Sequence, residues 1–288
     1  MRSGCLGWCH SGRGVGRKYL YAGMVSMSGR KLGCRPAVVL PGQPRLDGLR
    51  MMARKAPAVL DRSHINPAPL MLGNDQIGDC TSVGLANALR ATAALGGFQI
   101  GVDDDSAIQF YAESTGYRPG CPETDQGGIE VEVLSFAAGV GYQLEAGAYY
   151  PLWGTTDAQD RNALALIMAS LGTAYLGVQL AQSDMNQIEA TNGACVLEAN
   201  NGAYGDTTPG SAGGHCLLGW SYSGLSDSDT VDLLTWGTIQ KVTWGWLRSR
   251  IMEAHGLVWP QLTLANGLYP TGPDIDALKA QNVEFLTA

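Results

Sequence analysis

Cys80 and His215 are the residues of this sequence whose types and setting can support nucleophilic chemistry. Cys80 lies in GNDQIGDCTSVGLANAL, directly after Asp79 and at the start of a predicted helix. Unpaired N–H groups and the helix dipole favour a thiolate at such a position. His215 follows GSAGG and begins the apolar stretch HCLLGWSY, which predicts an imidazole at the mouth of a buried strand. A thiolate beside an imidazole is an activated nucleophile with its acid and base partner.

The elements that must position these two residues follow a helices-first order. Apolar residues at helical spacing after Asp79 predict a helix that ends at Gly96, with Asp79 as its N-cap. Further helices are expected at 105–113, 129–138 and 157–172. Strands are favoured for TAYLGVQL, GACVLEA, HCLLGWSYSG and DTVDLLTWG, which Gly-, Ser- and Asn-rich turns separate. WGWLRSRIMEAHG is expected to form a C-terminal helix that carries His255.

This order predicts an α+β fold with two lobes. The N-terminal lobe is helical, the C-terminal lobe is an antiparallel sheet or barrel, and a cleft separates them. The helix that begins at Cys80 would meet His215 across that cleft. Glycine-rich ANNGAYGDTTPGSA is expected to form a wall or lid of the cleft.

Five blocks, in order from about Pro57 to Trp259, resemble papain-family cysteine peptidases. PAVLDRSH is similar to the extended segment before the catalytic helix, and DQIGDCT to the D-Q-G-x-x-G-S-C block. TDQGGIEVEVLSFAAGVGYQLEAGAYYPL resembles the Gly-Gly helix and tyrosine-proline corner, GGHCLLGWSY the histidine strand, and LLTWGTIQKVTWGWLRSRI the N-S-W-G-x-x-W-G segment. Cys80 also precedes His215 by 135 residues, an order and separation expected for papain-like enzymes.

The resemblance implies a two-lobed papain-like fold and a set of site residues. Cys80 would be the nucleophile and His215 the base. Gln76 would donate to the oxyanion together with the Cys80 backbone N–H, and Trp236 would shield the histidine. The implied substrate is a peptide or protein, and no cofactor or metal ion is implied.

Three departures from the family pattern bear on whether the site is active or inert. Gln76 lies four residues before Cys80, where the family's glutamine lies six before, and Asp79 replaces a serine. Leu234 occupies the place of the asparagine that orients the imidazole, and leucine offers no hydrogen bond. Asp232 is the candidate substitute orienter, because alternate residues of a strand share a side.

Charge is distributed unevenly along the chain. Residues 1–60 hold 11 Lys/Arg and one acid, a net charge of +10, whereas the rest holds 8 Lys/Arg and 25 acids, a net charge of −17. A basic arm of this kind can bind a virion or another protein assembly, nucleic acid or the acidic body itself, or it can be a merely soluble tail. No convincing signal peptide and no membrane span are found, so a cytoplasmic or virion-associated location is expected.

The seven cysteines show no C-x-x-C pair and no regular disulfide spacing, which favours a reducing compartment. Cys5, Cys9 and His10 resemble only half of a zinc site. Three segments are predicted: a basic, Pro/Gly-rich arm at 1–53, a papain-like domain at 54–265 and a tail at 266–288.

Two functions stay open. One is a thiol hydrolase of peptide or peptide-like amide bonds with an atypical site. The other is an inert papain-like module with a binding or structural role. The block GND-x-x-GDCT and the later TWG-x-x-x-x-VTW also resemble uncharacterised phage and prophage proteins, which implies a virion-associated or lysis-associated role.

Overall fold

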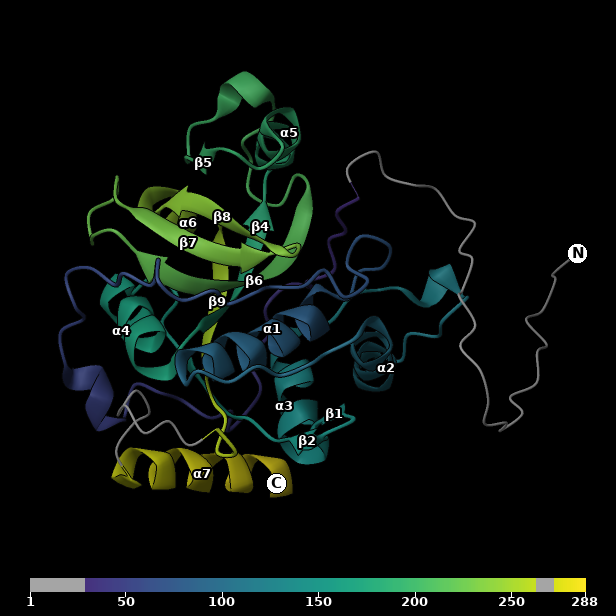
Figure 1. The fold of residues 1–288 in the computed structure, drawn as a ribbon, viewed down its shortest axis with the longest axis vertical. Helices are drawn as coiled ribbons and strands as arrows, with labels where there is room; N and C mark the ends of the chain where they lie inside the picture. Colours follow the sequence, from purple (N-terminus) through teal and green to yellow (C-terminus); the bar gives the residue numbers. More distant parts are fainter. Residues whose placement is uncertain (1–28, 263–271) are drawn as a thin grey trace, which may run out of the picture.

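The computed structural model describes residues 29–262 and 272–288. Helices dominate the first half of this part of the chain and strands the second (Figure 1). The α-helices are α1 (Cys80–Leu95), α2 (Asp104–Thr115), α3 (Glu130–Val140), α4 (Arg161–Leu171), α5 (Gln182–Thr191), α6 (Trp244–Arg250) and α7 (Gly272–Thr287). The described strands are β1 (Tyr142–Leu144), β2 (Gly147–Tyr149), β3 (Leu152–Thr156), β4 (Ala174–Leu180), β5 (Val196–Leu197), β6 (Gly213–Tyr222), β7 (Thr230–Thr235), β8 (Thr238–Thr243) and β9 (Ile251–Val258).

A seven-stranded sheet organises the second half, in the order β3-β9-β4-β6-β7-β8-β5. Its neighbours pair antiparallel except for β5 and β8, which are parallel. Strands β1 and β2 form a separate antiparallel pair. The fold is therefore α+β with a mixed, mainly antiparallel sheet, as the sequence predicts at this level.

The four predicted helices are confirmed, with ends shifted by a few residues. Asp160 caps α4, because its carboxylate accepts a hydrogen bond from the Ala163 N–H at 3.1 Å. Asp79 stands at the N-cap position of α1, but its side chain makes no capping hydrogen bond. The expected capping role of Asp79 is therefore wrong, and its buried carboxyl group needs another explanation.

The strand predictions are confirmed in place, but the predicted C-terminal helix is wrong in its second half. Helix α6 ends at Arg250, and the chain continues at once as β9, which lies between β3 and β4. His255 therefore lies in a central strand, where it pairs with Tyr175 and Thr155. Tertiary pairing on both edges of β9 overrides the helical pattern of this stretch.

Residues on both sides of the predicted central domain pack into it. Leu46, Leu49 and Met51 are buried in the core of the sheet half, although the sequence places them in the arm at 1–53. Residues 1–28, with four of that arm's nine Lys/Arg, lie outside the described residues. The C-terminal segment also differs from a tail, because α7 packs on β3 and Asn282 donates to the Trp153 carbonyl at 2.9 Å.

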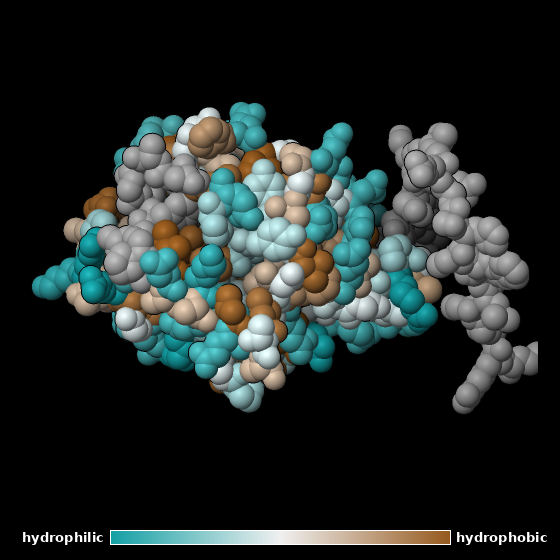
Figure 2. All heavy atoms as spheres, turned by 90° about the horizontal axis from the view of Figure 1, so that it is seen from below, coloured by the Kyte–Doolittle hydropathy of each residue, from teal (hydrophilic) through white to brown (hydrophobic). Residues whose placement is uncertain are grey.

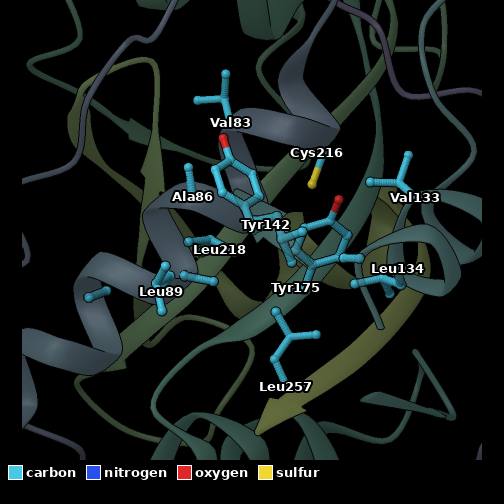
Figure 3. Close-up of a cluster of buried hydrophobic side chains, with 14 of the residues drawn as sticks. Val83, Ala86, Leu89, Val133, Leu134, Tyr142, Tyr175, Cys216, Leu218 and Leu257 are labelled. Carbon is cyan, nitrogen blue, oxygen red and sulfur yellow. The ribbon is translucent and has the colours of Figure 1, made fainter. Parts of the chain in front are cut away.

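Helix α1 packs against the sheet through a glycine. A Cβ atom at Gly84 would lie 2.8 Å from Cys216 Sγ of β6, so only glycine permits this approach. The Tyr175 hydroxyl of β4 donates to the Thr81 carbonyl of α1 at 2.8 Å. Figure 3 shows Cys216 and Tyr175 side by side in this core, with apolar side chains of α1 and α3 around them. The contact fixes the start of α1 relative to β6.

The outer surface near α7 mixes polar and apolar side chains (Figure 2). Val283 and Leu286 of α7 are among the exposed apolar residues. Within the described residues, no helix combines the length and apolar character needed to cross a membrane.

Candidate active site

Cys80 begins α1 directly after a tightly held loop. The Gly78 N–H donates to both carboxylate oxygens of Asp125, at 3.1 and 3.0 Å. The Tyr111 hydroxyl of α2 donates to Asp125 Oδ1 at 2.6 Å. The loop that delivers Cys80 is thus tied to α2 and to the segment before α3.

His215 lies near the start of β6, where Thr235 at the end of β7 and Trp236 directly after it contact its ring. Its Nε2 is 2.6 Å from Thr235 Oγ1. The imidazole stacks on the indole of Trp236, with ring centroids 4.1 Å apart and an interplanar angle of 14°. His215 Nδ1 is buried and has no hydrogen-bond partner in the described structure. A bond at Nε2 leaves Nδ1 as the nitrogen that can exchange a proton.

The structure brings Cys80 next to the histidine strand. Cys80 Sγ accepts a hydrogen bond from the backbone N–H of Cys216 at 3.4 Å, and Cys216 directly follows His215. The close contact of Gly84 with Cys216 holds α1 at this position. Cys80, at the N-terminus of α1, therefore contacts the residue next to His215 on β6. The Nε2 of that histidine is held by the Thr235 hydroxyl.

Residues 31–35, called the covering segment below, lie over this site. The Gly33 and Cys34 N–H groups both donate to the Gly214 carbonyl, at 3.2 and 3.1 Å. The Arg35 N–H donates to the Gly128 carbonyl at 2.9 Å, and the Gly128 N–H donates to the Gly33 carbonyl at 2.8 Å. The segment thus forms a parallel bridge with the chain before α3 and also bonds to the residue before His215.

Two further contacts seat the covering segment. The Trp236 indole N–H donates to the Lys31 carbonyl at 3.2 Å. A Cβ atom at Gly33 would lie 1.8 Å from the Gly78 carbonyl oxygen, so the close approach requires glycine at this position. Cys80 is only 1% exposed under this cover.

Burial determines the protonation of both residues. It raises the pKa of the Cys80 thiol to about 12, although hydrogen bonds from the Cys216 and Gly33 backbone oppose the shift. It lowers the pKa of His215 to about 3. At neutral pH the pair is a thiol and a neutral imidazole in this conformation. An active ion pair would require water or substrate to replace the covering segment.

Comparison with known proteins supports the fold but gives no match in sequence. Neither a protein-family model nor a curated protein sequence matches the chain. Among solved structures, xylellain, a cysteine protease from Xylella fastidiosa, matches with a TM-score of 0.57 and 14% identity, over 80% of this chain and 97% of xylellain.

Two proenzymes from the larval midgut of Tenebrio molitor match over a similar part of the chain. Digestive procathepsin L 3 has a TM-score of 0.52 and 13% identity, over 80% of this chain and 76% of its own. Digestive procathepsin L2 proteinase has a TM-score of 0.51 and 15% identity, over 81% and 79%. The chain has a papain-like fold.

Within the papain-like fold, Asp232 is placed away from the histidine. Its carboxylate accepts from Ser221 Oγ at 2.7 Å and from Lys241 Nζ at 2.6 Å, on neighbouring strands. Asp232 pairs with Ser221, six residues beyond His215 on β6, which is roughly 20 Å along a strand. The structure therefore contradicts Asp232 as the partner of His215. Leu234 is buried in the core and pairs with Leu218.

Thr235 is the residue that the sequence analysis missed. It follows Leu234 at the end of β7, where Trp236 and Gly237 take φ values of +44° and +69°. Leu218 of β6 pairs with Leu234, so Thr235 lies on the face of the sheet that His215 shares, and its hydroxyl reaches His215 Nε2. The signal in the sequence was the family's N-S-W-G block. In LTWG of this chain, Thr235 stands at the place of the serine and, like it, carries a hydroxyl group.

Gln76 is also placed away from the expected role. It is exposed, and among the described contacts its side chain has no hydrogen bond, while its backbone N–H donates to the Gly73 carbonyl at 2.8 Å. Asn74 stands at the six-residue spacing before Cys80 and is 1% exposed. Its side-chain amide donates to the Ile77 carbonyl at 3.1 Å, and its backbone carbonyl accepts from the Lys31 N–H at 2.9 Å. The six-residue spacing before Cys80, rather than the residue type, is what places Asn74 at the position of the family's glutamine.

Asp79 is completely buried, and neither of its carboxyl oxygens has a hydrogen-bond partner in the described structure. Burial raises the pKa of Asp79 well above its ordinary value. A protonated Asp79 carries no charge, so it does not oppose a thiolate at Cys80 in the way that an aspartate would.

The remaining cysteines and histidines play other parts. No disulfide is present among the described residues, and Cys5, Cys9 and His10 lie outside them. His255 is buried in β9, with Nδ1 3.0 Å from Thr155 Oγ1 and Nε2 3.2 Å from Glu253 Oε2. It belongs to a buried acidic group beside the covering segment rather than to the Cys80 site.

Proposed function

We propose that this chain is a papain-like cysteine peptidase, a thiol hydrolase of peptide or peptide-like amide bonds, held in a closed form by its own covering segment. The observation that carries the proposal is the pairing of Cys80 with the His215 strand, where Thr235 holds His215 Nε2 at 2.6 Å. Thr235 takes the orienting role that Leu234 cannot fill.

In this proposal the chemistry follows the usual course of a cysteine–histidine pair. Cys80 Sγ attacks the amide carbonyl carbon while His215 Nδ1 takes the thiol proton. His215 then gives that proton to the leaving amine as the C–N bond breaks. Water attacks the resulting thioester with His215 as base, which releases the acid and restores the thiol. The Cys80 backbone N–H, at the start of α1, would donate to the oxyanion, with Asn74 as the side-chain candidate in place of Gln76.

A peptide substrate would take the place of the covering segment in a cleft between the helical half and the sheet. Gly128 and Gly214 already offer their backbone groups to an extended chain, because the covering segment uses them. Such main-chain pairing with an extended peptide is a general mode of peptide recognition. Activity would then require movement of residues 31–35 away from Cys80.

The alternative is an inert papain-like module with a binding or structural role, and one observation favours it. Cys80 is 1% exposed, and burial raises the pKa of its thiol to about 12, so the described conformation has no reactive thiolate. In the alternative the covering segment never leaves. A virion-associated location and a protein assembly or nucleic acid bound by the basic arm stay predictions, since residues 1–28 lie outside the described residues.

A thiol-reactive probe on the full chain distinguishes the two functions. The peptidase predicts selective labelling of Cys80, loss of that labelling in Cys80→Ala, and unchanged labelling in Cys195→Ser. A peptide library should then be cleaved by the wild type and not by Cys80→Ala. Labelling that is slow and unselective across all cysteines, with no cleavage of any peptide, would establish the inert module.

A further inference from the structure

A buried acidic group lies beneath the covering segment. Glu130 begins α3 and is 0% exposed, while Glu253 lies in β9 and is 7% exposed. Cys34 of the covering segment points at them, with Cys34 Sγ 3.7 Å from Glu130 Oε1. One donor atom from each of these three residues lies within 4.8 Å of the other two. Three segments far apart in the sequence therefore bring a thiol and two carboxyl groups together.

The carboxyl oxygens of this group are incompletely satisfied. Glu130 Oε2 and Glu253 Oε1 are buried and have no hydrogen-bond partner in the described structure. His255 Nε2 lies 3.2 Å from Glu253 Oε2 and 3.5 Å from Glu130 Oε2, and no Lys or Arg of the described residues pairs with either glutamate. Buried carboxylates without a cation are costly, so the group must take up either protons or a cation.

We propose that Cys34, Glu130 and Glu253 bind a divalent metal ion, with Zn²⁺ the ion that the donors suit best. A thiolate is a ligand for Zn²⁺ and not for Mg²⁺ or Ca²⁺, which take oxygen ligands. Bond lengths of about 2.0–2.3 Å place the ligand atoms of a tetrahedral site roughly 3.2–3.8 Å apart. The 3.7 Å between Cys34 Sγ and Glu130 Oε1 falls in that range. Three protein ligands leave the fourth position to water.

His255 supports the site from outside the ligand set. Its Nε2 faces both carboxyl groups, and its Nδ1 lies 3.0 Å from Thr155 Oγ1. Groups that hold metal-bound carboxylates in this way orient the ligands and tune the affinity. Zn²⁺ binds the thiolate form of cysteine, so binding releases the Cys34 thiol proton.

The position of the ion gives it a structural consequence. Cys34 belongs to the covering segment, Glu130 to the helical half and Glu253 to the sheet. The ion fastens the covering segment to both halves of the molecule, one residue from the Gly33 that lies against Gly78. The sequence gives no sign of this site, because its ligands lie at positions 34, 130 and 253 without motif spacing.

Metal binding is tested on the full chain after removal of bound metals with a chelator. Calorimetric titration with Zn²⁺ should show one tight equivalent that is lost in a Cys34→Ser variant and weakened about a hundredfold in Glu253→Gln. Co²⁺ should give visible bands of a four-coordinate ion and a thiolate charge-transfer band, and Cys34→Ser should remove the charge-transfer band. Circular dichroism of each metal-free variant shows that it is folded.

Matched variants assign the ion to this place. Cys195→Ser and a Cys5→Ser/Cys9→Ser double variant should keep both the affinity and the charge-transfer band. A band that survives in Cys34→Ser but disappears in the double variant would overturn the proposal in favour of a site in the N-terminal arm. Zn²⁺ affinity equal in the wild type, Cys34→Ser and Glu253→Gln would overturn it in favour of a proton-filled group.

The fastening role is a second part of the proposal and fails separately. A chelator should speed alkylation of Cys80 at least tenfold in the wild type and leave the rate in Cys34→Ser unchanged. Equal rates with and without Zn²⁺ would overturn the fastening role. Neither readout requires turnover of a peptide, so failure of the peptidase proposal is distinguishable from failure of this one.

Discussion

At the residue scale, the histidine partner decides whether the site can work. A carboxamide oxygen can only accept a hydrogen bond, and so it fixes one imidazole tautomer. A threonine hydroxyl can accept or donate, so Thr235 holds the ring in place with less control over the proton. The stack on Trp236 supplies the rest of the orientation. We therefore expect a working site whose turnover is modest.

Replacing Thr235 with valine tests this role with little change of shape. Thr235→Val removes the 2.6 Å contact at His215 Nε2, so the fraction of imidazole with Nδ1 free should fall. We expect kcat for a peptide substrate to fall about tenfold or more, with a small change in KM. Thr238→Val, on the exposed part of β8, is the matched control. Equal kcat in the two variants would show that Thr235 does not orient His215.

The Leu234→Asn variant restores the family's asparagine at a position that is buried in the apolar core of this chain. Leu234 is 2% exposed and lies in the apolar core, so a carboxamide there would be buried without an evident partner. We expect a loss of about 2–4 kcal/mol in unfolding free energy and no gain in kcat. Urea unfolding and peptide turnover measure the two quantities. A gain in kcat without loss of stability would mean that residue 234 can reach His215.

At the element scale, the covering segment controls access to Cys80, and Gly33 is its most constrained point. In Gly33→Ala the new Cβ would start 1.8 Å from the Gly78 carbonyl oxygen, so the segment cannot seat as it does now. We expect alkylation of Cys80 to become at least tenfold faster, because exposure to water lowers the raised pKa of its thiol. The rate is measured by mass spectrometry after digestion.

The Gly48→Ala variant is the control for that experiment. Its added Cβ meets nothing within 4 Å, and it lies in the same N-terminal part of the chain. It should label at the wild-type rate. Fast labelling in both variants would mean that general loosening, rather than release of the covering segment, exposes Cys80.

How much of this could be predicted from the sequence depends on the range of each interaction. Helix α1, the strand β6 and the pairing of Cys80 with the His215 strand follow from local periodicity and block order. The partner of His215 did not follow, because it depends on the register of two strands. Leu218 pairs with Leu234, so Thr235, and not Leu234 or Asp232, lies on the same face of the sheet as His215. Strand β9 could not be predicted either. It forms a strand because it pairs with β3 and β4, which lie far earlier in the chain.

At the whole-molecule scale, the N-terminal region belongs to the folded body well before the boundary predicted at residue 53. Leu46, Leu49 and Met51 are at most 3% exposed, and burial of each such side chain contributes about 1.5–3 kcal/mol. Their sum is a large share of the 5–15 kcal/mol typical of a whole protein. The boundary predicted at residues 53 and 54 therefore cuts through the core rather than beside it.

Two truncations test that boundary. Removal of residues 1–53 should lower the Tm by at least ten degrees or leave the protein insoluble, because it removes three core side chains. Removal of residues 1–28 should leave the Tm close to that of the full chain, as expected for a basic arm without core periodicity. Calorimetry on both proteins gives the comparison. Equal Tm values for the two truncations would restore the boundary predicted from the sequence.

The buried Asp79 should make the stability of the whole molecule depend on pH. Burial raises its folded-state pKa well above the ordinary value of 3.8, so above pH 3.8 the unfolded chain releases a proton that the folded chain keeps. This group therefore opposes folding increasingly as pH rises, by about 1.4 kcal/mol per pH unit until its raised pKa is reached. Asp79→Asn keeps the shape without the titration. Urea unfolding should show the variant to be more stable than wild type at pH 8, with the advantage vanishing near pH 4. A variant less stable than wild type at pH 8 would mean that Asp79 is ionised in the folded protein and holds the start of α1 as an anion.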